Sequence, residues 1–110
     1  MVTYVPDRGD IVWLQFNPQS GHEQAGKRPA LTLSPRAYNQ KVGLAIFCPI
    51  TNQEKGYPFE VKVGSSKISG VILADQVKSL DWRIREAEFI FKASSIVINE
   101  AIGLLNTLIY

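Results

Sequence analysis

The hydrophobic residues of this chain fall into short runs separated by turn-forming residues. In PFEVKV (58–63), apolar and polar residues alternate, which places the three apolar side chains on one face of a strand. Other short runs, rich in β-branched and aromatic residues, lie at 11–16, 28–34, 71–80 and 82–91. This pattern predicts five to seven short strands.

Three segments depart from this alternation. VGLAIFCPI (42–50) is almost continuously apolar, which predicts a central strand buried on both faces. RAYNQK, after Ser34-Pro35, predicts one short helical turn. In the tail, Ile98, Ile102 and Ile109 recur at helical spacing after a serine at 94 or 95 that can cap a helix. We therefore predict one domain over residues 1–110, a small and strongly bent antiparallel barrel or sandwich that is mainly β with a C-terminal helix.

Composition narrows the function classes. The chain is 45% apolar and 20% charged, with a net charge of +2, so a polyanionic partner is permitted but not required. One histidine and one cysteine cannot form the usual metal sites, and neither a G-x-S-x-G motif nor a phosphate-binding glycine loop is present. Cys48, within an apolar run, is expected to be a buried inert thiol. Without a signal peptide or membrane-spanning run, we expect a cytoplasmic protein that does not contact membranes and has no cofactor.

The candidate chemistry is concentrated in the loop 19–27 and the residues beside it. HEQAGKRPA (22–30) contains Glu23, a possible proton acceptor, and Arg28, whose guanidinium can hold a phosphate with several donors. Thr51 follows Pro49 and brings a hydroxyl to the edge of the sheet. The alternative is a solvated charged loop, with Glu23 and Lys27 forming one exposed ion pair.

Other side chains near these elements could bind nucleic acid. Phosphate contacts are expected from Lys27, Arg36, Lys55 and Lys78. Stacking on unpaired bases is expected from Tyr38, Tyr57 and Trp82. Trp82 is alternatively an ordinary core aromatic.

Four motifs stand in one order between about residues 4 and 85: GDIVWLQFNP, GHEQAGKRPALTLSP, CPITNQEKGYPFEV and GVILADQVKSLDWR. In this order the chain resembles the MazF/PemK family of toxin–antitoxin endoribonucleases, and its tail is similar to that family's C-terminal helix. The resemblance implies an SH3-like (PemK/CcdB-like) barrel, a homodimer, and sequence-specific, metal-independent cleavage of single-stranded RNA, mainly mRNA. It also implies a cognate antitoxin whose disordered tail blocks the RNA groove.

The resemblance assigns roles position by position. Arg28 and Thr51 match the main catalytic positions of the family, and Glu23 matches a position with an auxiliary acid–base role. Gln76 and Lys78 match positions near the substrate groove. We expect cleavage by attack of the adjacent 2′-OH, giving a 2′,3′-cyclic phosphate and a 5′-OH end, with Glu23 as base, Arg28 stabilising the transition state and Thr51 donating a hydrogen bond. The identity of the general acid stays open.

Some positions depart from the family pattern. Gln15 and Asn17 stand where some members carry acids, and Asn52 stands where a second threonine occurs. These residues are expected to alter base contacts, while His22 is either a groove residue or a bystander. The competing interpretation is a non-catalytic toxin on the same fold that binds a protein such as DNA gyrase. Members of that class end in Trp-Gly-Ile, whereas this chain ends NTLIY and keeps Arg28 and Thr51.

Overall fold

The structure, a computed structural model, describes residues 3–16 and 26–110 of the chain. Its strands are β1 (Asp10–Gln15), β2 (Lys27–Thr32), β3 (Ala45–Thr51), β4 (Glu60–Lys62), β5 (Val71–Leu73), β6 (Lys78–Leu80) and β7 (Glu88–Lys92). Helix α1 (Arg36–Val42) separates β2 from β3, and helix α2 (Ser95–Ile109) ends the chain. The prediction of a mainly β protein with a C-terminal helix is confirmed.

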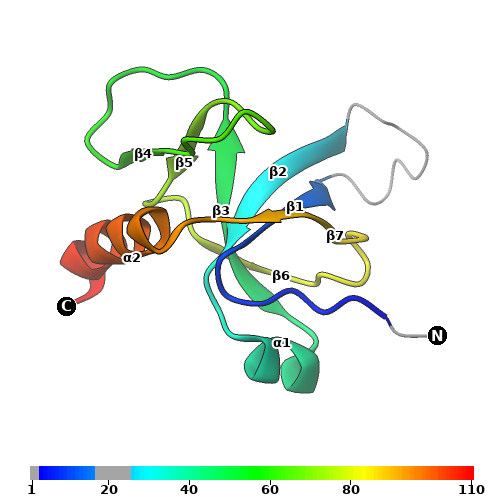
Figure 1. Cartoon of the computed structure of the whole chain (residues 1–110). Coiled ribbons are helices and arrows are strands. Elements are labelled where there is room, and N and C mark those ends of the chain that lie inside the picture. Colours follow the sequence, from blue (N-terminus) through cyan, green and yellow to red (C-terminus); the bar gives the residue numbers. More distant parts are fainter. Residues whose placement is uncertain (1–2, 17–25) are drawn as a thin grey trace.

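The strands form one antiparallel sheet in the order β4-β5-β3-β2-β1-β7, with β6 also paired to β3 (Figure 1). Within the described residues β4 and β7 are edges, so the bent sheet does not close into a complete barrel. The first half of β3 pairs with β6 through Ala45–Phe47, and its end pairs with β5 through Ile50 and Thr51. Pro49 has no N–H to donate to a neighbouring strand, and it lies where β3 changes its pairing from β6 to β5.

The structure changes the bounds of several predicted elements, and of the strand predicted at 58–63 only Glu60–Lys62 forms β4. The strand expected at 42–50 begins only at Ala45, because Gly43 ends α1 in the left-handed conformation (φ 84°) and donates its N–H to Asn39 O. The run 71–80 is split into β5 and β6 by a turn. The run 82–91 begins as a turn in which the Asp81 carboxylate accepts backbone N–H groups, so only Glu88–Lys92 forms a strand.

The sheet is buried on both faces, because strands β1, β2 and β3 contribute alternate side chains to two separate clusters. One cluster contains Ile11, Leu31 and Cys48 and extends to α2 through Ala101. The other contains Leu14, Phe47 and Trp82, with Val12, Ala30 and Ala45. The prediction of a buried thiol is confirmed, since Cys48 is fully buried, and this burial raises its pKa to about 12.

Helix α2 packs its buried side against the first cluster. Ser94 caps its start by accepting a hydrogen bond from Val97 N (3.2 Å), one of the two serines that the sequence offered. Ala101 is fully buried, and Leu104 and Leu105 pack beside it. In the described part of the chain, neither helix has the length and apolarity needed to cross a membrane.

The end of the molecule that carries α1 is held by a buried side chain, Asn39. Its Nδ2 donates to the carbonyl oxygens of Pro6 (2.7 Å) and Ser34 (3.0 Å), while its Oδ1 accepts from Ser34 Oγ. Trp82 Nε1 donates to the backbone oxygen of Asn39 (3.0 Å). Trp82 is therefore a core aromatic, and its stacking on RNA is excluded by its 2% exposure.

We expect Asn39→Ala to lower the free energy of unfolding by about 3 kcal/mol, because each buried group that loses its partner costs about 1–3 kcal/mol. Urea denaturation measures this loss. The matched control is the exposed neighbour Gln40→Ala, for which a change within about 0.5 kcal/mol is expected. Equal losses for the two variants would contradict the role given to Asn39.

Candidate functional site

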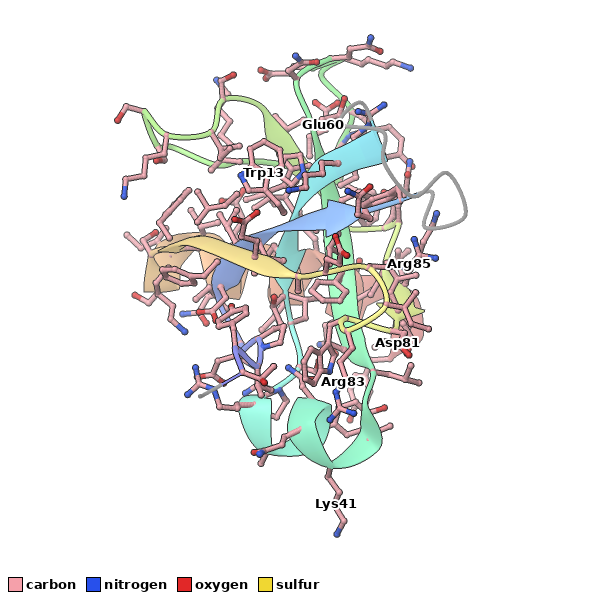
Figure 2. All side chains as sticks on the ribbon, turned by 90° about the vertical axis from the view of Figure 1, so that its right-hand side faces the viewer. Trp13, Lys41, Glu60, Asp81, Arg83 and Arg85 are labelled. Atoms are coloured by element: carbon pink, nitrogen blue, oxygen red, sulfur yellow. The ribbon has the colours of Figure 1, made fainter. Side chains whose placement is uncertain are left out.

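An open hollow of about 780 Å³ lies where β2 begins and β3 ends. Its lining comes from four segments: Trp13 and Phe16; Lys27, Arg28 and Pro29; Pro49, Ile50, Thr51, Asn52 and Gln53; Lys67, Ile68 and Ser69. The start of β2 and the end of β3 lie at the end of the sheet opposite α1 (Figure 1). Figure 2 shows the same separation, with Trp13 in one half of the molecule and Lys41 of α1 at the other end.

The pairing of β2 with β3 explains why Arg28 and Thr51 meet. The last pairs of this antiparallel ladder are Leu31 with Cys48 and Ala30 with Pro49. Extending this register by two residues beyond the last pair places Arg28 opposite Thr51. Both residues line the hollow, so positions 23 apart in sequence form one wall.

Arg28 is exposed, and its Nη1 donates to the backbone oxygen of Lys27 (3.4 Å). Its backbone is held by β1, because Arg28 pairs with Leu14 of that strand. The ammonium of Lys27 makes an ion pair with Glu88 of β7 (3.3 Å). Such a surface pair contributes at most about 1 kcal/mol, so it does little to hold Lys27 away from the hollow.

The hydroxyl of Thr51 already accepts one hydrogen bond within the protein. Its Oγ1 accepts a hydrogen bond from the backbone N–H of Gln53 (3.1 Å), which leaves the O–H proton able to donate to a bound oxygen. Asn52 and Gln53 follow it along the same wall and offer side-chain amides. The end of β3 therefore supplies neutral hydrogen-bonding groups beside the guanidinium of Arg28.

After the residues from β2 and those from the end of β3, a third part of the lining comes from the turn 64–70 between β4 and β5. The sequence pattern described this turn only as polar. Gly70 (φ 121°) packs so closely that a Cβ there would lie 2.3 Å from the backbone oxygen of Thr51. Ile68 packs against the core cluster from the same turn. The turn is thus pressed against the end of β3, which brings Lys67 into the lining.

The hollow is positively charged. Its described lining includes Lys27, Arg28 and Lys67 but no carboxylate. Trp13, Phe16 and Ile68 add apolar surface between the cations. Cations with apolar and aromatic surface suit a ligand that carries phosphates and flat bases.

A second hollow of about 370 Å³ adjoins the first through Thr51 and Gln53. Its other lining residues are Lys55, Tyr57, Glu60, Leu73 and Gln76. The Glu60 carboxylate shapes this region by accepting the backbone N–H groups of Lys55, Gly56 and Tyr57 (3.0–3.2 Å). The Tyr57 hydroxyl donates to Asp75 (2.7 Å), and this hydrogen bond raises the pKa of the phenol.

The far end of β1 is anchored by Arg85, a residue without a predicted role. Its Nη1 donates to the carbonyl oxygens of Gln15 and Phe16 (both 3.1 Å), and Gln15 N donates back to Arg85 O. Phe16 N donates to Gly26 O, so residues 16 and 26 are held together. These bonds position the strands from which Trp13 and Arg28 enter the site.

The predicted site residues separate into three groups. Those that line one or both hollows are Lys27, Arg28, Thr51, Asn52, Lys55, Tyr57 and Gln76. Lys78 lies exposed on β6 and lines neither hollow, and Arg36 and Tyr38 lie on α1, away from both. Those outside the described residues are Asn17, His22 and Glu23, so the predicted Glu23–Lys27 pair is also outside them.

The main lining residues that sequence reasoning missed are Trp13, Phe16, Gln53, Lys67 and Ile68. For Trp13 no periodic signal existed, because residues 11–14 are all apolar and alternation does not separate their faces. For Lys67 the sequence offered only a polar turn. Among the described residues, no group of three or more His, Cys, Asp or Glu side chains is placed to hold a metal ion.

Comparisons with known proteins agree with this architecture. The family described as "PemK-like, MazF-like toxin of type II toxin-antitoxin system" matches residues 7–109. The "Endoribonuclease toxin MazF" of Escherichia coli K12 is 56% identical over 84 residues, which cover 76% of each chain. Among solved structures, MazF from Deinococcus radiodurans has a TM-score of 0.87 at 54% identity, covering 97% of this chain and 98% of that one. A MazE-MazF structure from the same organism has a TM-score of 0.88 at 48% identity, covering 97% of both chains.

We expect Gly70→Ala to lower the free energy of unfolding by about 3 kcal/mol or more, because the methyl group would meet the Thr51 backbone in a strained conformation. Urea denaturation measures the loss. Gly64→Ala is the control: its φ is also positive (69°), but nothing lies within 4 Å, so about 1 kcal/mol is expected from strain alone. A loss at Gly70 no larger than at Gly64 would show that the close approach does not matter.

Proposed function

Because this chain belongs to the PemK-like, MazF-like family of type II toxin–antitoxin toxins, we propose that it is the toxin of such a system and acts by cleaving RNA. The observation that supports this most directly is the shared wall of Arg28 and Thr51 in a cationic hollow. Relatives named as endoribonucleases favour cleavage over the non-catalytic alternative. We propose that the protein acts in the cytoplasm, where its RNA substrate is found. We also propose that residues 1–110 form a single toxin domain.

The reaction that suits these residues is attack of a ribose 2′-OH on the adjacent phosphate. The O2′–P bond forms and the P–O5′ bond breaks, giving a 2′,3′-cyclic phosphate and a 5′-OH end. Negative charge on the phosphoryl oxygens must be stabilised, one proton must leave the 2′-OH, and one must reach the departing 5′ oxygen. The reaction therefore needs donors aimed at the phosphate, a proton acceptor for the 2′-OH and a proton donor for the 5′ oxygen, and no metal.

Arg28 and Thr51 are suited to hold the phosphate. A guanidinium offers several donors in a planar fork and keeps its positive charge throughout the reaction. The Thr51 O–H adds a neutral donor from the facing strand, held in place by the N–H of Gln53. Glu23 keeps its predicted role as base, although it lies outside the described residues, and the proton donor to the 5′ oxygen is left open.

The second hollow suits a neighbouring nucleotide. Because Thr51 and Gln53 belong to both hollows, a strand whose phosphate lies at Thr51 can place its next base near Tyr57 and Gln76. Tyr57 offers a ring that is 46% exposed, and Gln76 offers an amide for a base edge. We propose single-stranded RNA as the substrate, because these groups reach a base only when it is unpaired.

The same groove is the proposed site of an antitoxin. Solved relatives include complexes named MazE-MazF, which supports a cognate antitoxin for this chain. A disordered acidic segment lying along the cations would exclude RNA by occupying the phosphate positions. Inhibition would then need no change in the fold.

We also propose a homodimer, supported by the apolar surface of α2. Ile109 is 73% exposed, and Ile102 and Leu108 are partly exposed as well. Ile102 and Ile109 are two helical turns apart and therefore share a face. Apolar residues gathered on one helix mark an interaction surface, and a second copy presents the same surface.

We expect Arg28→Ala to lower kcat/KM for cleavage of a long single-stranded RNA by about 10²–10³-fold, the usual effect of removing one preorganised charge-stabilising group. Cleavage is followed on gels, and the new ends are mapped as 5′-OH. The circular dichroism spectrum and urea midpoint should match the wild type, because Arg28 is exposed.

The control variant is Lys41→Ala, which removes an exposed cation from the opposite end of the molecule (Figure 2). Wild-type cleavage is run in parallel with EDTA, which should leave the rate unchanged. A folded Arg28→Ala protein that cleaves normally would remove Arg28 from the mechanism. Loss of activity in EDTA, restored by Mg²⁺, would overturn the metal-free reaction.

We expect the wild type to sediment as a dimer at micromolar concentration, and Ile102→Lys to weaken the dimer by about 30-fold, the effect of losing one interface hot spot. Thr107→Lys, on the opposite side of α2 and also exposed, is the matched control and should leave the dimer intact. A wild type that stays monomeric at this concentration would refute the dimer. Equal weakening by both variants would place the interface elsewhere.

A further inference from the structure

We propose that Lys67, on the turn between β4 and β5, binds a phosphate of the RNA substrate other than the one held by Arg28 and Thr51. This inference rests on the proposed function and extends its groove to the third part of the lining. Lys67 would then be a substrate-binding residue that sets affinity, and not a catalytic one.

The first argument is position. In the sheet, β3 lies between β2 and β5, so Arg28 and the turn 64–70 are on opposite sides of the end of β3. Lys67 lines the same hollow as Arg28 from that other side. A strand crossing Thr51 would therefore pass from one cation to the other.

The second argument is the rigidity of the turn that carries Lys67. Ile68, the next residue, is packed on the core, and Gly70 is pressed against the Thr51 backbone. Within the turn, the Lys67 N–H donates to Ser65 Oγ (3.1 Å). The backbone of Lys67 is thus fixed relative to Thr51, while its ammonium stays in solvent.

The third argument is charge. Lys27, Arg36 and Lys92 form ion pairs with carboxylates of the described residues. Lys27 is already paired with Glu88, whereas Lys67 belongs to none of these pairs, and no carboxylate is in the described lining of the hollow. The exposed Lys67 ammonium therefore meets no carboxylate of the described lining, which leaves its charge able to attract a phosphate.

The test measures how binding depends on salt. Each phosphate neutralised on a single strand contributes about 0.7 to the slope of log Kd against log salt concentration. We expect Lys67→Gln to make this slope shallower by about 0.7. The ratio of the variant's Kd to the wild-type Kd should therefore fall by about 2.5-fold between 50 and 200 mM KCl. Lys67→Arg should restore the wild-type slope, because it restores the charge.

The probe is a fluorescein-labelled, mixed-sequence, single-stranded 20-mer with 2′-O-methyl groups throughout, which the proposed 2′-OH attack cannot cleave. Lys41→Gln is the matched control and should keep the wild-type slope, since Lys41 lies on α1 at the far end of the molecule (Figure 2). An unchanged slope for Lys67→Gln, or an equal change for Lys41→Gln, would overturn the inference.

Cleavage of unmodified RNA by the wild type is measured separately, so the two hypotheses can fail independently. Cleavage with an unchanged Lys67→Gln slope would leave the proposed function standing and reject the role of Lys67. A shallower slope without any wild-type cleavage would support the phosphate contact and reject the ribonuclease.

Discussion

The pairing of β2 with β3 is the constraint on which the rest of this structure depends. Three antiparallel pairs, from Thr32–Phe47 to Ala30–Pro49, set the register of two strands that are buried on both faces. A slip by one residue would turn every buried side chain of one strand to the wrong cluster, so the register is strongly specified. The facing positions of Arg28 and Thr51 follow from that register.

Close approaches of the backbone and hydrogen bonds to backbone groups also shape the site. Gly70 allows the turn 64–70 to lie against Thr51, and Arg85 holds the carbonyl groups at the end of β1. Glu60 shapes the neighbouring turn with three backbone N–H groups. The functional side chains remain solvated on a rigid frame, which suits a groove that must bind a flexible polyanion.

Much of the secondary structure could be predicted, because periodicity records which faces are buried. Within the alternating segment 58–63, residues Glu60–Lys62 form strand β4. The helical spacing of the tail corresponds to helix α2, which Ser94 caps. The errors occurred where local turn chemistry overrode hydrophobicity. Gly43 ended α1 inside an apolar run, and Asp81 turned the chain at a tryptophan that pattern alone assigned to a strand.

The sequence by itself determined the element types, the family, and Arg28 and Thr51 as the residues on which the proposed chemistry depends. It could do so because strand periodicity is local and because the motifs lie within short segments. Only the tertiary structure decided that Trp13 and Lys67 join those residues and that Lys78 lines neither hollow. The reason is physical: membership of a site depends on which strand ends meet in space, and here that was decided by the pairing of β2, β3 and β5.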